Sequence, residues 1–193
     1  MRPGQDLVVG GFIGIGGTVY AAEKFEADLR KTLPKFLLDA VGRFRAELCR
    51  QPGRVAGSSE VLAEAVRGGG ITMEDVREGG ILAALWNAAE RYRAGLAVYL
   101  RRIPVRQETV EICEALGLNP YRLLSGGCTL FAADNGNDVL WALGEAGICG
   151  AVIGKVTGGR DRLILNGEVR SHLNRPAPDE IEKLKKKTEG VQP

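Results

Sequence analysis

Short apolar runs alternate with helix-like patterns along most of this chain, and glycine clusters stand at several of the junctions. Apolar runs of strand length lie at 7–9, 71–73, 96–100, 129–133, 151–156 and 163–165. Helical spacing of apolar residues marks 81–92, 107–116 and 139–146, and a further helix is expected from Pro34 to Leu48. Asn166-Gly167 between two short strands is a strong hairpin signal. Alternation with a hairpin predicts an α/β protein, a layered mixed sheet with helices packed on it.

The length suits one such domain with a short extension. The chain has 193 residues, of which 45% are hydrophobic and 26% charged. A core of this size needs no disulfide, metal or cofactor for folding. We expect the α/β domain to span 1–175. Residues 176–193 are polar and are predicted to form a partly helical or flexible tail, with a solvated helix at 179–187.

Charge and cysteine content exclude several classes of protein. The formal net charge of +2 gives no basis for nucleic-acid binding. No apolar run approaches the roughly 20 residues of a membrane span, and the N-terminus lacks the apolar region of a signal peptide. The four cysteines form no C-x-x-C pair, and His172 is the single histidine. Reduced, buried cysteines and a cytoplasmic location are expected.

The first glycine cluster follows the strand at 7–9 and contains Gly14, Gly16 and Gly17. A dinucleotide fingerprint would place a third Gly or Ala where Val19 stands, so NAD binding is rejected. Thr18 is the expected N-cap of the following helix. Two readings of the glycines stay open: they let a backbone approach a ligand closely, or they only form a tight turn.

The second cluster, 74–80, precedes the helix that starts at Ile81. Unpaired N–H groups at a helix start attract anions, and Gly79 and Gly80 would leave them accessible. Arg77 would assist a phosphate, whereas Glu74 and Asp75 suit one only through a bridging Mg²⁺. The alternative is that Asp75 merely caps the helix.

The third cluster is Ser125-Gly126-Gly127, directly before the strand at 129–133. Its glycines permit a close chain reversal, and Ser125 has a hydroxyl that could donate to a phosphate or cap a turn. Outside the clusters, His172 is expected at the surface, and Trp86 and Trp141 are expected to anchor the core from helices.

Four stretches of the chain, which contain or adjoin these clusters, resemble in their order the C-terminal domain of the AIR synthase (PurM) superfamily. The resemblance is to its AIR-synthase-related, HypE-like hydrogenase-maturation branch. The matching stretches are 3–9 with 14–18, 72–81, 117–123 and 153–157, which together cover roughly residues 3–170. The resemblance implies a PurM-type α/β fold that closes a cleft against an N-terminal domain, which supplies most of the ATP and magnesium site. It also implies ATP-dependent ligase or dehydratase-type chemistry, through a phosphorylated oxygen intermediate, once that partner domain is present.

The chain departs from the family pattern at points that bear on activity. Glu74 stands where a His is common, and Arg77 stands where Thr or Ser is common. The chain ends at Pro193 without the cysteine that a HypE-type protein uses as carbamoyl acceptor, and the match begins at Met1. These departures leave the catalytic residues unassigned and disfavour an enzyme that acts alone.

The leading hypothesis is a cytoplasmic domain that binds the phosphate of a nucleotide (ATP, with Mg²⁺) or of a phosphorylated intermediate. The binding residues would be Asp75, Arg77, Gly79 and Gly80 with the glycines at 14, 16 and 17 and with Ser125, Gly126 and Gly127. Its protein partner would be a second copy or a separate N-terminal domain. The alternative is a non-catalytic binding or assembly module that keeps the fold. The leading hypothesis requires an anion on the peptide nitrogens before Ile81. If the chain's own carboxylates occupy those nitrogens, or packed side chains fill the site, nucleotide binding there is to be abandoned and only the scaffold assignment retained.

Overall fold

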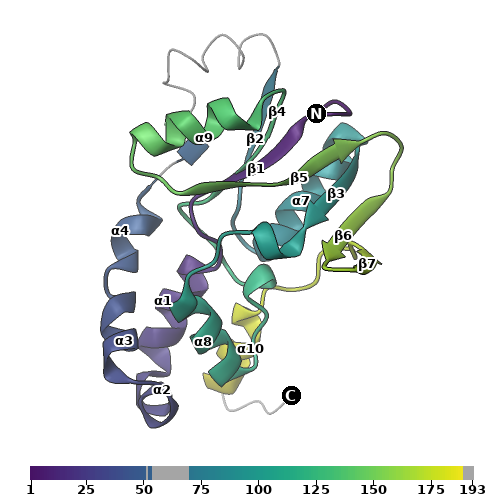
Figure 1. Ribbon diagram of the computed structural model, residues 1–193. Coiled ribbons are helices and arrows are strands. Elements are labelled where there is room, and N and C mark those ends of the chain that lie inside the picture. The colour runs from purple at the N-terminus through teal and green to yellow at the C-terminus, as the bar shows by residue number, and fades with distance from the viewer. Residues whose placement is uncertain (51, 54–69, 189–193) are drawn as a thin grey trace.

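A mixed seven-stranded sheet forms the centre of the computed structural model, which describes residues 1–50, 52–53 and 70–188 (Figure 1). Its order is β2-β4-β1-β5-β3-β6-β7. Only the β3–β6 pair is parallel. The strands are β1 (Asp6–Gly10), β2 (Ile71–Asp75), β3 (Gly95–Tyr99), β4 (Thr129–Ala133), β5 (Gly150–Thr157), β6 (Arg162–Asn166) and β7 (Val169–His172). The predicted mixed α/β sheet is thus confirmed, hairpin included.

Two of the helices pack on the faces of the sheet, and the others form a separate group. They are α1 (Ile15–Lys24), α2 (Glu26–Thr32), α3 (Lys35–Val41), α4 (Phe44–Leu48), α7 (Gly80–Tyr92), α8 (Gln107–Leu116), α9 (Gly136–Glu145) and α10 (Ile181–Thr188), with short 3-10 turns η1 (Leu100–Arg102) and η2 (Pro120–Arg122). No helix in the described part of the chain is long and apolar enough to cross a membrane. The sequence also predicts a short helix from Ser58 or Ser59 to about Val66, and this segment lies outside the described residues.

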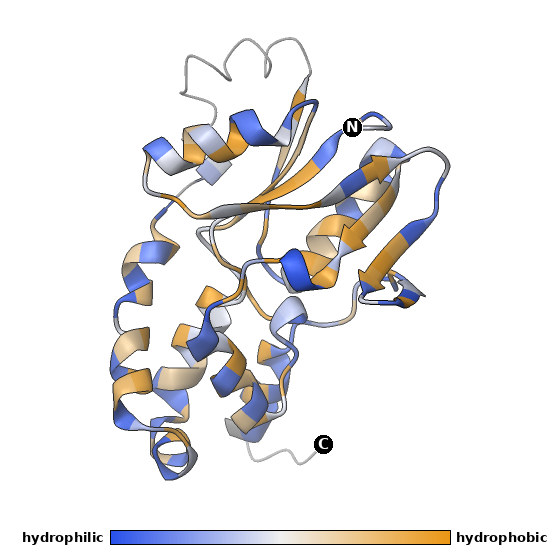
Figure 2. Ribbon diagram, viewed as in Figure 1, coloured by the Kyte–Doolittle hydropathy of each residue, from blue (hydrophilic) through white to orange (hydrophobic). Residues whose placement is uncertain are grey.

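Each sheet face has its own apolar cluster. Leu7 and Val9 of β1 pack with Ile81 and Leu85 of α7 on one face. Val8, between them, packs on the other face with Phe131 and with α9. Figure 2 shows the strands largely in the hydrophobic colour, whereas the helices alternate between both colours. The strict alternation along β1 therefore sets the two-sided layering.

A third cluster holds the helical group together at one end of the sheet (Figure 1). It joins α1, α2, α3, α4, α8 and α10 through buried residues such as Ile15, Leu29, Ile112 and Leu184. The C-terminal segment is therefore more than a solvated helix, since Leu184 is fully buried and Ile181 is 7% exposed. The predicted boundary at 175 stays a prediction.

Three local expectations differ from the structure. The first helix begins at Ile15 after a left-handed Gly14, so Thr18 is not its N-cap; inside α1 its hydroxyl donates to the Gly14 carbonyl at 2.7 Å. The helix expected from Pro34 is divided into α3 and α4 near Gly42. Trp141 is not a core anchor, because it is 55% exposed on the outer side of α9.

The remaining single-residue expectations gave mixed results. Trp86 is partly buried, with the Arg162 guanidinium 4.1 Å from its ring. His172 is exposed, as expected. Cys113 and Cys128 are buried, whereas Cys49 and Cys149 are exposed.

Candidate functional site

A cleft of about 1020 Å³ lies at the β2 end of the sheet, and we call it the β2–α7 cleft. It brings the second and third glycine clusters together, although some 45 residues separate them in the sequence. Its lining consists of Leu48, Arg50, Pro52, Gly53, Met73, Asp75, Arg77, Glu78, Ala84, Asn87, Leu124, Ser125, Gly126, Cys128 and Thr129. The described lining residues include two arginines and two carboxylates, whose formal charges balance.

The second cluster forms the turn between β2 and α7. Gly79 and Gly80 have positive φ angles of 75° and 65°, which favour glycine. A Cβ on Gly80 would lie 2.5 Å from the Tyr121 carbonyl oxygen. Close packing of η2 against the helix start therefore requires glycine here, independently of any ligand.

The peptide nitrogens of Gly79 and Gly80, where α7 begins, already have partners within the chain. The Gly79 N–H donates to Oδ2 of Asp179 at 2.6 Å, and the Gly80 N–H donates to the Arg77 carbonyl at 3.2 Å. The other Asp179 oxygen accepts from the N–H groups of Leu124 at 3.0 Å and Ile181 at 2.9 Å. Asp179 is only 9% exposed. A carboxylate of the C-terminal segment thus occupies the position at which an external anion was expected. The condition stated from the sequence is met, so no phosphate site is assigned to these nitrogens.

Arg77 is the one cationic residue of the second cluster, and its side chain is exposed. Its guanidinium lies 3.0 Å from the Asp75 carboxylate, and the two side chains are 78% and 59% exposed. An exposed pair of this kind contributes little to stability, so both groups can exchange partners. The Arg77 carbonyl also accepts from the Ser125 N–H at 3.2 Å and thereby ties the two clusters together.

Glu74 and Asp75 do not converge on one point. They are neighbours on β2, so their side chains point to opposite faces of the sheet. Glu74 pairs with Arg91 on α7, and Asp75 pairs with Arg77. The described residues contain no group of three His, Cys, Asp or Glu side chains that could hold a metal ion. This donor arrangement does not fit the Mg²⁺ site considered from the sequence.

The first cluster lies behind the cleft wall and supports the third. The Ser125 hydroxyl oxygen accepts from the Gly14 N–H at 2.9 Å, and the Gly17 N–H donates to the Leu124 carbonyl at 2.8 Å. A Cβ on Gly16 would lie 2.5 Å from the Ser125 carbonyl oxygen. The close approach at these glycines is therefore made by the chain's own 123–125 segment.

The members of the third cluster have different environments. Ser125 is 4% exposed and engaged with Gly14. Gly126 lines the cleft, whereas a Cβ on Gly127 would lie 2.0 Å from the Glu47 carbonyl oxygen of α4. A Cβ on Gly126 would also lie close to the chain, 3.0 Å from Cδ2 of Leu48, so this glycine too is accounted for by packing.

The cleft wall includes a cysteine without nucleophilic character. Burial, and secondarily the charge of Asp75, raise the pKa of the Cys128 thiol far above its ordinary value. Because the thiolate is the reactive form, Cys128 is an inert wall residue.

Sequence reasoning did not identify Asp179, Arg50 or Asn87. Asp179-Glu180-Ile181-Glu182 has the spacing of a helix N-cap followed three residues later by Glu, which agrees with the predicted helix at 179–187 but does not indicate a contact with α7. Its contact with Gly79 spans 100 positions of the chain, and no local pattern predicts that pairing.

A scan against family models matches residues 2–166 to the C-terminal domain of AIR synthase related proteins. The chain belongs to this family. The resemblance inferred from the glycine clusters is thereby confirmed, and the matched range contains all three clusters but not Asp179.

HypE proteins are among the relatives of this AIR synthase related chain. It is 26% identical over 163 residues to the carbamoyl dehydratase HypE of Rhizobium leguminosarum bv. viciae, covering 79% of this chain and 41% of the relative. The E. coli HypE structure matches with a TM-score of 0.66 at 20% identity, covering 92% of this chain and 51% of that one. A HypE structure in complex with ATP matches with a TM-score of 0.62 at 19% identity, covering 90% and 51%. The chain therefore spans about half of these relatives, or less.

Proposed function

We propose that this domain forms one wall of a nucleotide-phosphate cleft that an N-terminal AIR-synthase-type domain completes. The observation that carries the proposal is the β2–α7 cleft, in which the second and third glycine clusters meet. Its volume of about 1020 Å³ suits a nucleotide-sized ligand. A HypE protein of the same fold has been solved with ATP, which supports nucleotide as the ligand class.

The ligand contacts in this proposal come from side chains and not from the α7 nitrogens. Asp179 holds the Gly79 nitrogen, and Ser125 holds Gly14. Arg77 remains as an exposed cation that can exchange the Asp75 carboxylate for a phosphate oxygen. The balanced charge of the wall explains why the domain would need the partner domain for tight binding and for ATP-dependent ligase or dehydratase-type chemistry.

Calorimetry with ATP·Mg²⁺ and with ADP tests this proposal, using the chain alone and the chain mixed with the N-terminal half of a HypE protein. We expect binding heat in the mixture and little without the partner. Arg77→Ala should weaken binding about tenfold, the loss of one charge-assisted contact. Arg43→Ala, at the exposed junction of α3 and α4, is the matched control. Absence of heat from both nucleotides in the mixture would exclude nucleotide binding.

The second candidate is a non-catalytic assembly module that keeps the fold and has lost the ligand. It is favoured by Asp179, because the chain's own carboxylate takes the Gly79 and Leu124 donors. In that case Arg77→Ala leaves binding of an N-terminal domain unchanged, as measured by analytical ultracentrifugation.

Added phosphate tests whether the peptide nitrogens at the α7 start can bind an anion once the Asp179 carboxylate is removed. If the peptide nitrogens retain anion affinity, inorganic phosphate should raise the melting temperature of Asp179→Ala more than that of wild type, because the vacated Gly79 and Leu124 donors can bind it. Equal shifts in both proteins would show that these nitrogens have no anion affinity of their own, and the choice between the two candidates would then rest on the calorimetry of Arg77→Ala.

A further inference from the structure

The half of the sheet formed by β3, β6 and β7 presents an unusual surface on the face that carries α9. Register places Lys155, Ala97, Leu163 and His172 in one row across β5, β3, β6 and β7. Tyr99, Leu165 and Arg170 form the next row. Paired residues project to the same side of a sheet. The first row continues from Lys155 to Asp6 on β1. Asp6 and Val8 lie on the same face of β1, and this is the face that α9 covers. We call this surface the open half-face.

Helix α9 covers only the other half of that face. It packs against β4, β1 and β5, over Val8 and Phe131. In Figure 1, α9 lies over the β4–β1 side, well away from β6 and β7. Tyr99 is accordingly 42% exposed, and Arg170 and His172 are exposed.

The centre of the open half-face is apolar although no helix of the described residues covers it. A sheet with one solvated face normally alternates apolar and polar residues. Here β6 carries Leu163, Ile164 and Leu165 in succession, and Ile164 is buried on the α7 face. Leu163 and Leu165 therefore project to the other side, beside Ala97 and Tyr99, and remain half-buried there. Such a pattern is expected where a further protein layer packs.

Cations surround this apolar centre. Arg102 stacks over Tyr99 with its guanidinium carbon 4.3 Å from the ring centre, and Arg101 donates to the Asn166 side chain at 3.0 Å. Arg170 projects from β7, and Lys155 pairs with Asp6 at 2.7 Å. The pair of Lys155 with Asp6 is neutral as a whole. The excess positive charge of the surface therefore comes from the three arginines.

We propose that the open half-face docks an acidic protein segment whose aliphatic side chains cover Leu163 and Leu165 while its carboxylates meet the surrounding arginines. Charge complementarity selects an acidic partner over a basic one. Aliphatic leucines cannot stack on bases, and Arg102 already covers the one tyrosine, so the surface suits protein better than single-stranded nucleic acid.

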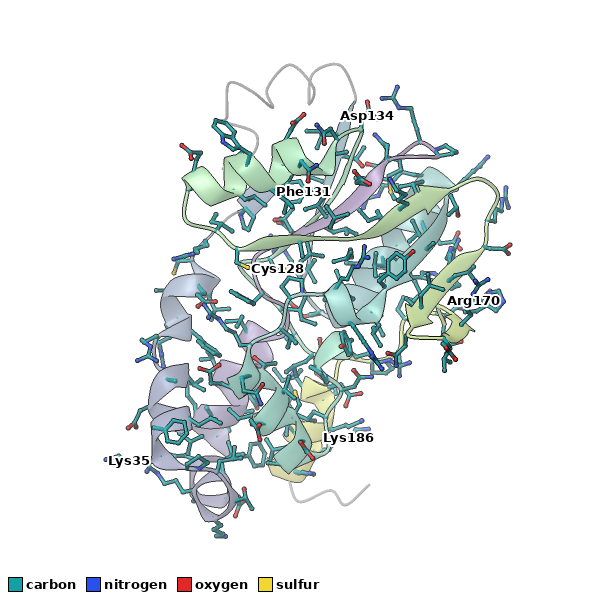
Figure 3. The ribbon with its side chains drawn as sticks, viewed as in Figure 1. Lys35, Cys128, Phe131, Asp134, Arg170 and Lys186 are labelled. Carbon is teal, nitrogen blue, oxygen red and sulfur yellow. The ribbon has the colours of Figure 1, made fainter. Side chains whose placement is uncertain are left out.

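This surface is separate from the β2–α7 cleft. The cleft lies at the β2 end of the strand order and the open half-face at the β7 end. Figure 3 shows Arg170 at the β7 edge and Cys128, a cleft residue, well apart from it near the middle of the molecule. A segment docked here leaves the cleft accessible, so the inference does not depend on nucleotide binding.

The test uses the full chain and a fluorescent synthetic peptide of alternating leucine and glutamate, with a leucine–lysine peptide as the opposite-charge control. Fluorescence anisotropy should show binding of the acidic peptide only. Methyl NMR should show shifts at Leu163 and Leu165 and none at Met73 in the cleft. Arg170→Glu and Leu165→Gln should each weaken binding about tenfold, whereas Lys35→Glu on the remote helix α3 should not.

Several outcomes would overturn the inference. These are no binding of the acidic peptide, equal binding of both peptides, or binding unchanged in both Arg170→Glu and Leu165→Gln. Displacement of the peptide by single-stranded oligothymidine would assign the surface to nucleic acid instead. Dimerisation of the chain that Arg170→Glu abolishes would assign it to a second copy. Circular dichroism of each variant separates lost binding from lost fold.

Discussion

At the scale of single residues, Asp179 determines how the candidate site is interpreted. Its carboxylate accepts N–H groups of Gly79, Leu124 and Ile181, and so joins the start of α7, the cleft wall and the start of α10. Two helix N-termini share this one buried carboxylate, which complements the partial positive charge at both. The feature that would attract a phosphate is thus used in holding the C-terminal segment.

Asp179→Ala should lower the free energy of unfolding by about 3 kcal/mol, because buried backbone donors lose their acceptor. Urea denaturation followed by circular dichroism measures the change. The matched control is Asp138→Ala on α9, whose exposed carboxylate accepts from the Asn135 side chain at 2.8 Å. The control should stay within about 0.5 kcal/mol of wild type. A loss no larger for Asp179 than for Asp138 would show that the shared contact is weak.

The cysteines offer a second test at this scale. Burial, with a smaller contribution from Glu180, raises the pKa of the Cys113 thiol from 9.0 to about 12. At pH 8, a thiol reagent should therefore label exposed Cys49 and Cys149 rapidly, and Cys113 and Cys128 only after unfolding. Rapid labelling of all four thiols in the folded protein would contradict the burial of the last two.

The raised pKa of Cys113 also predicts a pH dependence of stability. Because the folded-state pKa lies above the unfolded one, the stabilising contribution is complete below pH 9 and decreases as the pH rises toward about 12. The free energy of unfolding should fall more steeply across this window in wild type than in Cys113→Ala. Urea denaturation at each pH measures the free energy of unfolding. If its pH dependence is the same in both proteins, Cys113 does not contribute to it.

At the scale of elements, the glycines of the first cluster determine how α1 meets the 123–125 segment. Gly16→Ala should cost about 2 kcal/mol, because its Cβ would lie 2.5 Å from the Ser125 carbonyl oxygen. Gly144→Ala on α9 is the matched control, since nothing lies within 4 Å of its Cβ. The control should stabilise the protein by up to about 1 kcal/mol through helix propensity. Thermal unfolding compares the two, and equal effects would contradict the close packing at Gly16.

Sequence reasoning succeeded for elements and was weaker for contacts between them. The strands near 129–133 and 163–170 and the helix at 107–116 were placed correctly, because period and turn chemistry are local. The N-cap at Thr18 was wrong because a left-handed Gly14 starts α1 one turn earlier. The opposite orientations of Glu74 and Asp75 follow from strand geometry once β2 is extended to Asp75. The partner of Gly79 lay beyond any local pattern.

At the scale of the whole molecule, the C-terminal segment behaves as part of the fold. Leu184 is fully buried in the cluster that joins α1, α3 and α8, and Asp179 fixes the entrance to α10. The sequence shows charge here, with lysines at 185, 186 and 187, and these dominate its hydropathy. The two buried apolar residues of α10 are too few to reveal an amphipathic helix without its neighbours.

Leu184→Ala should therefore lower the free energy of unfolding by about 3 kcal/mol, the usual cost of removing a fully buried leucine side chain. A chain shortened to residues 1–175 should lose more, since it lacks both this side chain and the Asp179 carboxylate. Lys186→Ala, on the exposed side of the same helix, should be neutral. Urea denaturation of the four proteins tests the domain boundary directly. If the shortened chain unfolds at the same urea concentration as the full chain, residues 176–193 are the dispensable tail that their composition suggests.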